Sequence, residues 1–216
     1  MSKNWFLTLF KAGLLSVIFV FLAVAGAPKL GLQDVPELPA ADGSGDTPEI
    51  VIDLLPAGAT GQTQLKLSSL RGKVVMLDMF WSQCPHCEEH APHIVELYNQ
   101  YRERGFTVLG LATDPQEDKA TAGRIKAFAA KAKINYPLGY MTNEIVAYYA
   151  HPKDHGVPQM ILFGPDGKMA MREIGWNEEV GKKVKAAIEA QLSKVPTVKP
   201  GSKASAKPNQ NKTKHG

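Results

Sequence analysis

The middle of the chain alternates between short apolar runs and stretches in which only one face is apolar. Apolar runs at residues 73–80, 106–112 and 160–163 predict buried strands. Apolar residues spaced three and four apart predict two amphipathic helices, one beginning near Pro85 and one from about Gln116 to Lys133. Shorter patterns add candidate strands and helices at residues 50–52, 65–67, 143–149 and 169–174 and after Asn177.

These elements follow the order β-β-β-α-β-α-(β)-α-β-β-α. The sequence Gly-Pro-Asp-Gly at residues 164–167 has the chemistry of a turn and predicts a hairpin between the last two strands. An alternation of this kind predicts an α/β fold, with an N-terminal β-hairpin and a central mixed sheet that has helices on both faces.

The N-terminal segment has the features of an export signal. Lys3 and Lys11 precede an apolar run at residues 12–25, which ends in the small-residue pattern Ala23-Val24-Ala25. The run is short for a membrane span, but neighbouring aromatic residues would lengthen it. A signal peptide and an N-terminal membrane anchor both remain open for residues 1–27. Either one predicts an extracytoplasmic location, in the periplasm or on the outer face of the inner membrane.

The charge of the chain is concentrated at its ends. The formal net charge is +4, yet residues 1–25 hold two lysines and residues 195–216 hold five, and neither segment has an acidic residue. The rest of the chain therefore carries a net charge of −3. We predict a Pro- and Gly-rich linker at residues 28–48, one domain at residues 49–194 and a disordered basic tail at residues 195–216. Nothing in this distribution favours nucleic-acid binding.

The only two cysteines form the tetrapeptide Cys84-Pro85-His86-Cys87, where a predicted strand meets a predicted helix. Unpaired N–H groups and the helix dipole favour negative charge at a helix N-terminus, so a thiolate is stabilised at Cys84. His86, when protonated, favours the same anion. The pattern predicts a redox dithiol with Cys84 as nucleophile and the more buried Cys87 as resolving thiol.

Two structural explanations of the cysteine pair are weaker. The run Cys-x2-Cys-x2-His-x2-His ends at His90 and His93, but steps of three residues drift around a helix and cannot surround one ion. We therefore expect both histidines to face solvent, and we predict neither a metal nor another cofactor. A structural disulfide across so short a loop would add little stability.

The order of the motifs resembles a thioredoxin fold, and several single positions match. Asp78 lies six residues before Cys84, at the place of the buried acid of thioredoxins, and Pro92 lies five after Cys87, at the place of the helix-kinking proline. Gly156-Val157-Pro158 matches the cis-proline loop. The segment at residues 67–76 and a β-α insertion before this loop resemble exported TlpA/ResA-type thioredoxins.

The resemblance implies roles for Asp78, Pro158 and Val157. Asp78 would accept the Cys87 proton through water, because an ionised carboxylate in an apolar strand is costly. Pro158 would shield the sulfurs, and Val157 would pair with the backbone of a bound substrate. Trp81 is a second candidate for substrate binding, although it is equally suited to core packing.

Some positions depart from the TlpA/ResA pattern. Gln83 replaces the tryptophan usually found before the first cysteine, and His90 replaces a common glutamate. The Cys-Pro-His-Cys motif and Val157 resemble instead the oxidant DsbA, but the separation between Cys84 and Pro158 leaves no room for DsbA's large inserted helical domain.

We therefore expect a thiol–disulfide oxidoreductase that reduces disulfides of exported proteins, in a repair role or a role like cytochrome c maturation. Its partners would be exported disulfide or dithiol proteins and a membrane electron-transfer partner. A DsbA-like oxidant is one alternative. Another is a copper-binding module in which His151 and His155, together with His86 or His90, assist the same cysteines, because copper(I) favours thiolate ligands.

Overall fold

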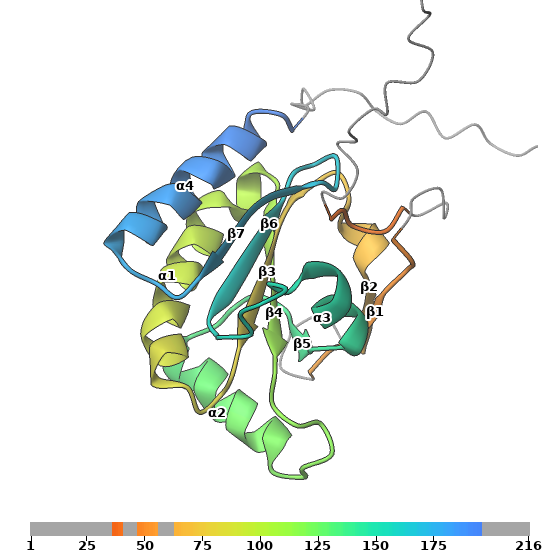
Figure 1. Cartoon of the computed structure of the whole chain (residues 1–216). Helices are drawn as coiled ribbons and strands as arrows, with labels where there is room; N and C mark the ends of the chain where they lie inside the picture. The colour runs from red at the N-terminus through yellow and green to blue at the C-terminus, as the bar shows by residue number, and fades with distance from the viewer. Residues whose placement is uncertain (1–35, 41–46, 56–62, 196–216) are drawn as a thin grey trace, which may run out of the picture. The chain divides into compact units, whose positions relative to one another are not determined.

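A computed structural model describes residues 36–40, 47–55 and 63–195 (Figure 1). Its elements follow the predicted order, including the strand between the second and third α-helices that was given in parentheses above. The strands are β1 (Val51–Asp53), β2 (Gln64–Lys66), β3 (Val74–Phe80), β4 (Phe106–Ala112), β5 (Leu138–Tyr140), β6 (Gln159–Phe163) and β7 (Met169–Ile174). The helices are η1 (Leu67–Leu70), α1 (Pro85–Tyr101), η2 (Arg102–Arg104), α2 (Thr121–Ala132), α3 (Asn143–Tyr149) and α4 (Glu178–Leu192).

Five strands form the central sheet in the order β5-β4-β3-β6-β7. The strand β3 lies in the middle, with β4 parallel on one side and β6 antiparallel on the other. Strands β1 and β2 pair antiparallel as a separate two-stranded sheet. The predicted mixed sheet and N-terminal hairpin are therefore confirmed.

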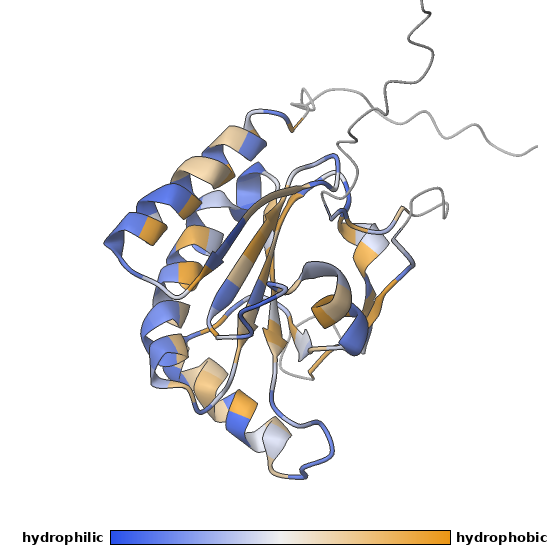
Figure 2. Ribbon diagram, viewed as in Figure 1, coloured by the Kyte–Doolittle hydropathy of each residue, from blue (hydrophilic) through white to orange (hydrophobic). Residues whose placement is uncertain are grey.

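The seven residues of β3 are all buried, and they alternate between the two faces of the sheet. Val74, Met76 and Phe80 pack in the core beneath α1, α2 and α4, whereas Val75, Leu77 and Met79 pack in a second core beneath α3, η1 and β1. The helices thus cover both faces, as predicted (Figure 1). Hydrophobic residues line the strands, and the outer faces of α1 and α4 are hydrophilic (Figure 2).

The helix α2 begins later than the periodicity predicted, at Thr121 instead of Gln116. The carboxylate of Asp118 accepts a hydrogen bond from the Ala120 N–H, and the Thr121 hydroxyl donates to the carbonyl of Pro115. These local bonds hold residues 115–120 in a loop, because short polar side chains compete with helical backbone bonds.

Residues 36–40, inside the predicted linker, pack against the domain. Leu38 is fully buried, and its N–H donates to the Gly167 carbonyl. The Arg71 guanidinium donates to the carbonyls of Leu38 and Pro39. This part of the segment therefore belongs to the folded unit. The predicted signal or anchor at residues 1–27 lies outside the described residues, as does nearly all of the predicted tail. Within the described ranges, no helix is long and apolar enough to cross a membrane.

Candidate active site

Cys84 is the N-cap residue of α1 and directly follows the turn at the end of β3. Its N–H donates to the Trp81 carbonyl, and its own carbonyl accepts from the N–H groups of Cys87 and Glu88. Pro85 suits the first helical position, where its missing N–H costs nothing. The Cys84 side chain therefore lies at the positive end of the helix, as predicted, with 8% of its surface exposed.

Cys87 lies one turn into α1 and is only 1% exposed. Both cysteines are free thiols. Burial raises the pKa of the Cys87 thiol far above its ordinary value, and the neighbouring Cys84 and Asp78 raise it further. Cys87 therefore stays protonated unless a local group takes its proton.

The loop before β6 covers Cys84. The Val157–Pro158 peptide bond is cis, as the resemblance implied, and Pro158 is buried. The Cys84 Sγ lies 3.8 Å from the Val157 carbonyl oxygen. This contact joins residues 73 positions apart in the chain and brings the predicted substrate-pairing residue beside the predicted nucleophile.

Asp78 lies on the α1 face of β3 and is 2% exposed. The Nε2 of His90 is 3.0 Å from Asp78 Oδ1, and the Tyr136 hydroxyl donates to Oδ2 at 3.4 Å. Burial raises the pKa of Tyr136 well above its usual value, as does the nearby Asp78, so Tyr136 remains a neutral donor. The predicted buried acid is thus held between an imidazole and a phenol.

The prediction that His90 faces solvent is wrong, because its side chain is 1% exposed. The stripe of buried residues in α1 begins before Ile94, and His90 lies on it three residues after Cys87. If the helical periodicity of apolar residues had been extended back to Cys87, it would have predicted that His90 is buried. His93 is exposed, as predicted, and stacks on Trp176 with ring centroids 5.0 Å apart.

Two other predicted site residues point outward. The His86 side chain is 82% exposed, and its Nδ1 lies 3.8 Å from a carboxylate oxygen of Glu89. Trp81 is 41% exposed, which favours a contact surface over core packing. Exposed aromatic side chains of this size are common anchors in protein interfaces.

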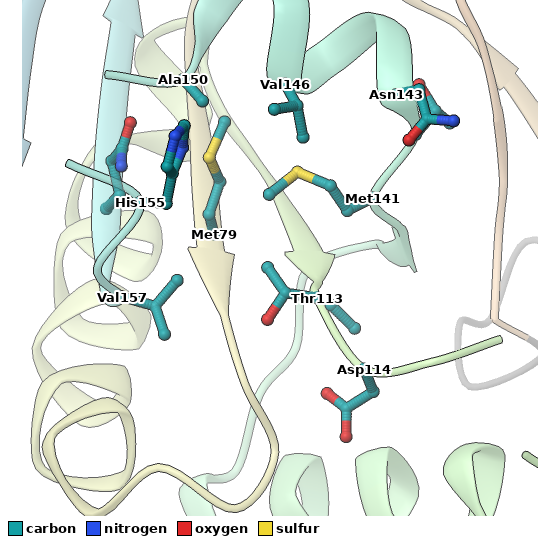
Figure 3. A pocket seen from close by; sticks show the side chains of 12 residues that line it. Met79, Thr113, Asp114, Met141, Asn143, Val146, Ala150, His155 and Val157 are labelled. Atoms are coloured by element: carbon teal, nitrogen blue, oxygen red, sulfur yellow. The ribbon is translucent and has the colours of Figure 1, made fainter. Parts of the chain in front are cut away.

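A surface cavity of about 360 Å³ opens beside the cis-proline loop (Figure 3). Val157 lines its edge, and the side chains of Met79, Met141 and Val146 extend into it. Asp114 and other polar groups surround these apolar side chains. Sequence patterns did not reveal the cavity, because its walls come from β3, α3 and the loops at the strand ends.

Two of the histidines considered for copper binding lie near this cavity. The Nδ1 of His151 accepts the backbone N–H of Asp154 at 3.0 Å, so this nitrogen organises the loop. His155 is one of the cavity-lining residues. Within the described residues, no group of three or more His, Cys, Asp or Glu side chains is positioned to hold a metal ion.

The sequence of the chain is similar to those of known proteins. A model of the AhpC/TSA family matches residues 49–172, more than half of the chain. Protein DipZ of Mycobacterium bovis is 34% identical over 83 residues, a match that covers 38% of this chain and 12% of DipZ. Thiol-disulfide oxidoreductase ResA of Bacillus cereus is 28% identical over 134 residues, covering 61% of this chain and 69% of ResA.

A solved structure gives the same fold. The thiol:disulfide interchange protein of the thioredoxin family from Chlorobium tepidum superposes with a TM-score of 0.56 at 20% identity, covering 74% of this chain and 99% of that one. The predicted thioredoxin fold is confirmed by this likeness. The family match over residues 49–172 shows that the chain belongs to the AhpC/TSA family, and its sequence is similar to that of ResA.

Proposed function

We propose that the protein is an extracytoplasmic thiol–disulfide oxidoreductase that reduces disulfide bonds of exported polypeptides. The observation that carries this proposal is the asymmetry of the cysteine pair. Cys84 is at the helix N-terminus beside the cis-proline loop, and Cys87 is buried behind it with a raised pKa. A more accessible thiol suits attack on a substrate, whereas a buried one suits reaction with its neighbour alone.

In the proposed reaction, the Cys84 thiolate attacks one sulfur of a substrate disulfide and forms a mixed disulfide. Cys87 then loses its proton and attacks the Cys84 sulfur, which releases the substrate as a dithiol and leaves Cys84 and Cys87 oxidised. A membrane electron donor would restore the dithiol. Residues 1–27 would export the domain or anchor it beside that donor.

The cavity beside Val157 supports polypeptides as substrates. A segment paired with the Val157 backbone would run past the cavity, and an apolar side chain next to the substrate cysteine would contact Met79 and Met141. Trp81 would add contact area on the same segment. Met79 and Met141 have flexible side chains, which suits contact with several different apolar side chains.

The surroundings of His86 favour the reducing direction. A protonated histidine that stabilises the nucleophile thiolate makes the oxidised protein a stronger oxidant. His86 is instead largely in solvent with Glu89 as its charged neighbour, and exposed charges of this kind interact weakly. The resemblance of the sequence to exported TlpA/ResA-type thioredoxins implies the same direction.

Two measurements test this function, and a third tests the copper-binding alternative. A Cys87→Ser variant should accumulate covalent complexes with exported proteins on non-reducing gels, and a Cys84→Ser variant should not. The reduction potential, measured by equilibration with glutathione, should lie near that of thioredoxin at about −270 mV. A potential near the DsbA value of about −120 mV would reverse the direction and support the oxidant. Copper that copurifies with the reduced wild type but not with the cysteine variants would favour the metal-binding module.

A further inference from the structure

The buried pair of Asp78 and His90 forms one unit behind the dithiol. Asp78 comes from β3 and His90 from α1, and their side chains meet at 3.0 Å with almost no exposure to solvent. His90 lies three residues after Cys87 on the same buried face of the helix, so these two side chains are neighbours. The pair and the buried thiol therefore share one enclosed environment.

The hydrogen bonds of the pair indicate where its protons lie. Within the described residues, the Nδ1 of His90 is buried and has no hydrogen-bond partner. A doubly protonated imidazole would leave a donor unpaired there, which costs more than an unpaired acceptor. The arrangement that fits is a neutral imidazole whose Nε2–H donates to an ionised Asp78. This unit carries one negative charge and is able to take up one proton.

We propose that the Asp78–His90 pair, and not Asp78 alone, accepts the proton that Cys87 loses when it attacks the mixed disulfide. This inference rests on the proposed function and assigns a positioning role to His90, which acts through Asp78. The S–H bond of Cys87 breaks as its sulfur bonds to Cys84, and the electron pair of the broken mixed disulfide leaves on the substrate sulfur. The substrate is reduced, the cysteine pair is oxidised, and the proton remains on the pair.

The net charge of the site favours this route. Before the step the pair holds the negative charge, and afterwards the departing substrate thiolate holds it. Proton transfer from the neutral pair to this thiolate returns the pair to its starting form. No additional charge is created in the buried site at any stage, so the cost of burying a second ion is avoided.

The other groups that face the Asp78–His90 pair do not compete with it as acceptors of the Cys87 proton. Tyr136, from the loop before β5, is a neutral donor, and β4 contributes only Gly110 opposite Asp78. On the side of α4, Trp176 packs edge-on against the His90 ring at 5.0 Å. His93 stacks on the same indole. In the part of the chain that the structure describes, His93 makes no hydrogen bond or ion pair with Asp78.

Ellman's reagent separates the two thiol steps. The first equivalent of its coloured thiolate is released when Cys84 reacts, and the second is released when Cys87 resolves the mixed disulfide. We expect His90→Gln to leave the first phase unchanged and to slow the second phase at neutral pH by about tenfold or more. The pH profile of the second phase should also change. His93→Gln is the matched control and should leave both phases unchanged.

Further variants distinguish proton transfer from a structural role. Asp78→Asn should slow the second phase at least as much, and the double variant should be no slower than Asp78→Asn alone. His90→Glu should restore part of the rate, with a pH profile unlike that of the wild type. Folded His90→Gln protein with an unchanged second phase and pH profile would overturn the inference, as would equal slowing of both phases. A wild type without a second phase would overturn the proposed function as well.

Discussion

Ser82 donates two hydrogen bonds to the carboxylate of Asp114, one from its backbone N–H and one from its hydroxyl. Ser82 lies in the turn that leads to Cys84, and Asp114 lies two residues beyond the end of β4. The Asp114 side chain is completely buried, and the Nε of Arg124 is 4.0 Å from it. The turn before Cys84 is therefore held to the segment that follows the neighbouring strand β4.

Removal of this tie should loosen the turn. We expect Asp114→Ala to lower the free energy of unfolding by about 2–3 kcal/mol, because two donors of Ser82 lose a charged acceptor. Thiol exchange at Cys84 should also slow. Urea unfolding and alkylation rates measure both effects. Asp118→Ala, which changes a half-exposed partner of Arg124, should have a small effect, and an equal effect of the two variants would contradict the assignment.

The stability of the reduced protein should depend on pH through Cys87. Burial holds the pKa of its thiol above the unfolded value of about 8.5. The folded state therefore retains this proton more tightly, and the resulting stability is complete below about pH 8.5 and lost as the pH rises above it.

We expect the reduced wild type to lose about 1.4 kcal/mol more than Cys87→Ser between about pH 7 and pH 9.5. Urea unfolding under reducing conditions at both pH values gives the difference. Parallel behaviour of the two proteins would mean that the Cys87 thiol titrates normally in the folded state.

Gly110 should be required for the contact between Tyr136 and Asp78. It pairs with Asp78 across β3 and β4, and an added Cβ would overlap Leu138 and lie 3.2 Å from Tyr136 Cε2. Gly110→Ala should therefore destabilise the protein by about 1–3 kcal/mol. Gly123→Ala is the control: it lies in α2 with open space around it, and should stabilise by about 0.5–1 kcal/mol. Thermal unfolding tests both signs.

Arg71 should hold residues 36–40 on the domain. Besides the carbonyls of Leu38 and Pro39, it contacts Glu37 at 3.5 Å. We expect Arg71→Ala to make this segment sensitive to limited proteolysis, with cleavage sites identified by mass spectrometry. Lys182→Ala removes an exposed ion pair with Glu178 and should leave the digestion pattern unchanged. Protection of the segment in Arg71→Ala would show that burial of Leu38 alone holds it.

The order of the elements could be predicted from the sequence because each has a clear local signal. Asn177 accepts a hydrogen bond from the Val180 N–H at 2.8 Å, and Val180, Val184, Ile188 and Leu192 are buried as their spacing predicted. The start of α2 was missed, since side-chain bonds of Asp118 and Thr121 decide it. The packing of Leu38 depends on Arg71, a residue 33 positions away.

Some residues of the candidate site could likewise be predicted from the sequence, and others could not. The cysteines, Val157 and Pro158 stand in recognisable motifs, and Asp78 is conspicuous as an acid inside an apolar strand. Their meeting could therefore be predicted. The partners of Asp78 could not be predicted from spacing alone, because Tyr136 is 58 positions away and reaches it only across Gly110. Asp114 was missed for the same reason, as its role exists only once β3 and β4 lie side by side.

Asp78 and Met79 are consecutive residues of β3, yet they face opposite sides of the sheet. Asp78 points toward α1 and its hydrogen-bond partners His90 and Tyr136, whereas Met79 lines the cavity that we propose for substrate. In the proposed function, this one strand therefore separates contact with the substrate from proton transfer. We therefore expect substitutions in the cavity to change which polypeptides are accepted and to leave the thiol–disulfide exchange itself unchanged. In this thioredoxin fold, two adjacent residues of one strand therefore serve separate parts of the proposed function.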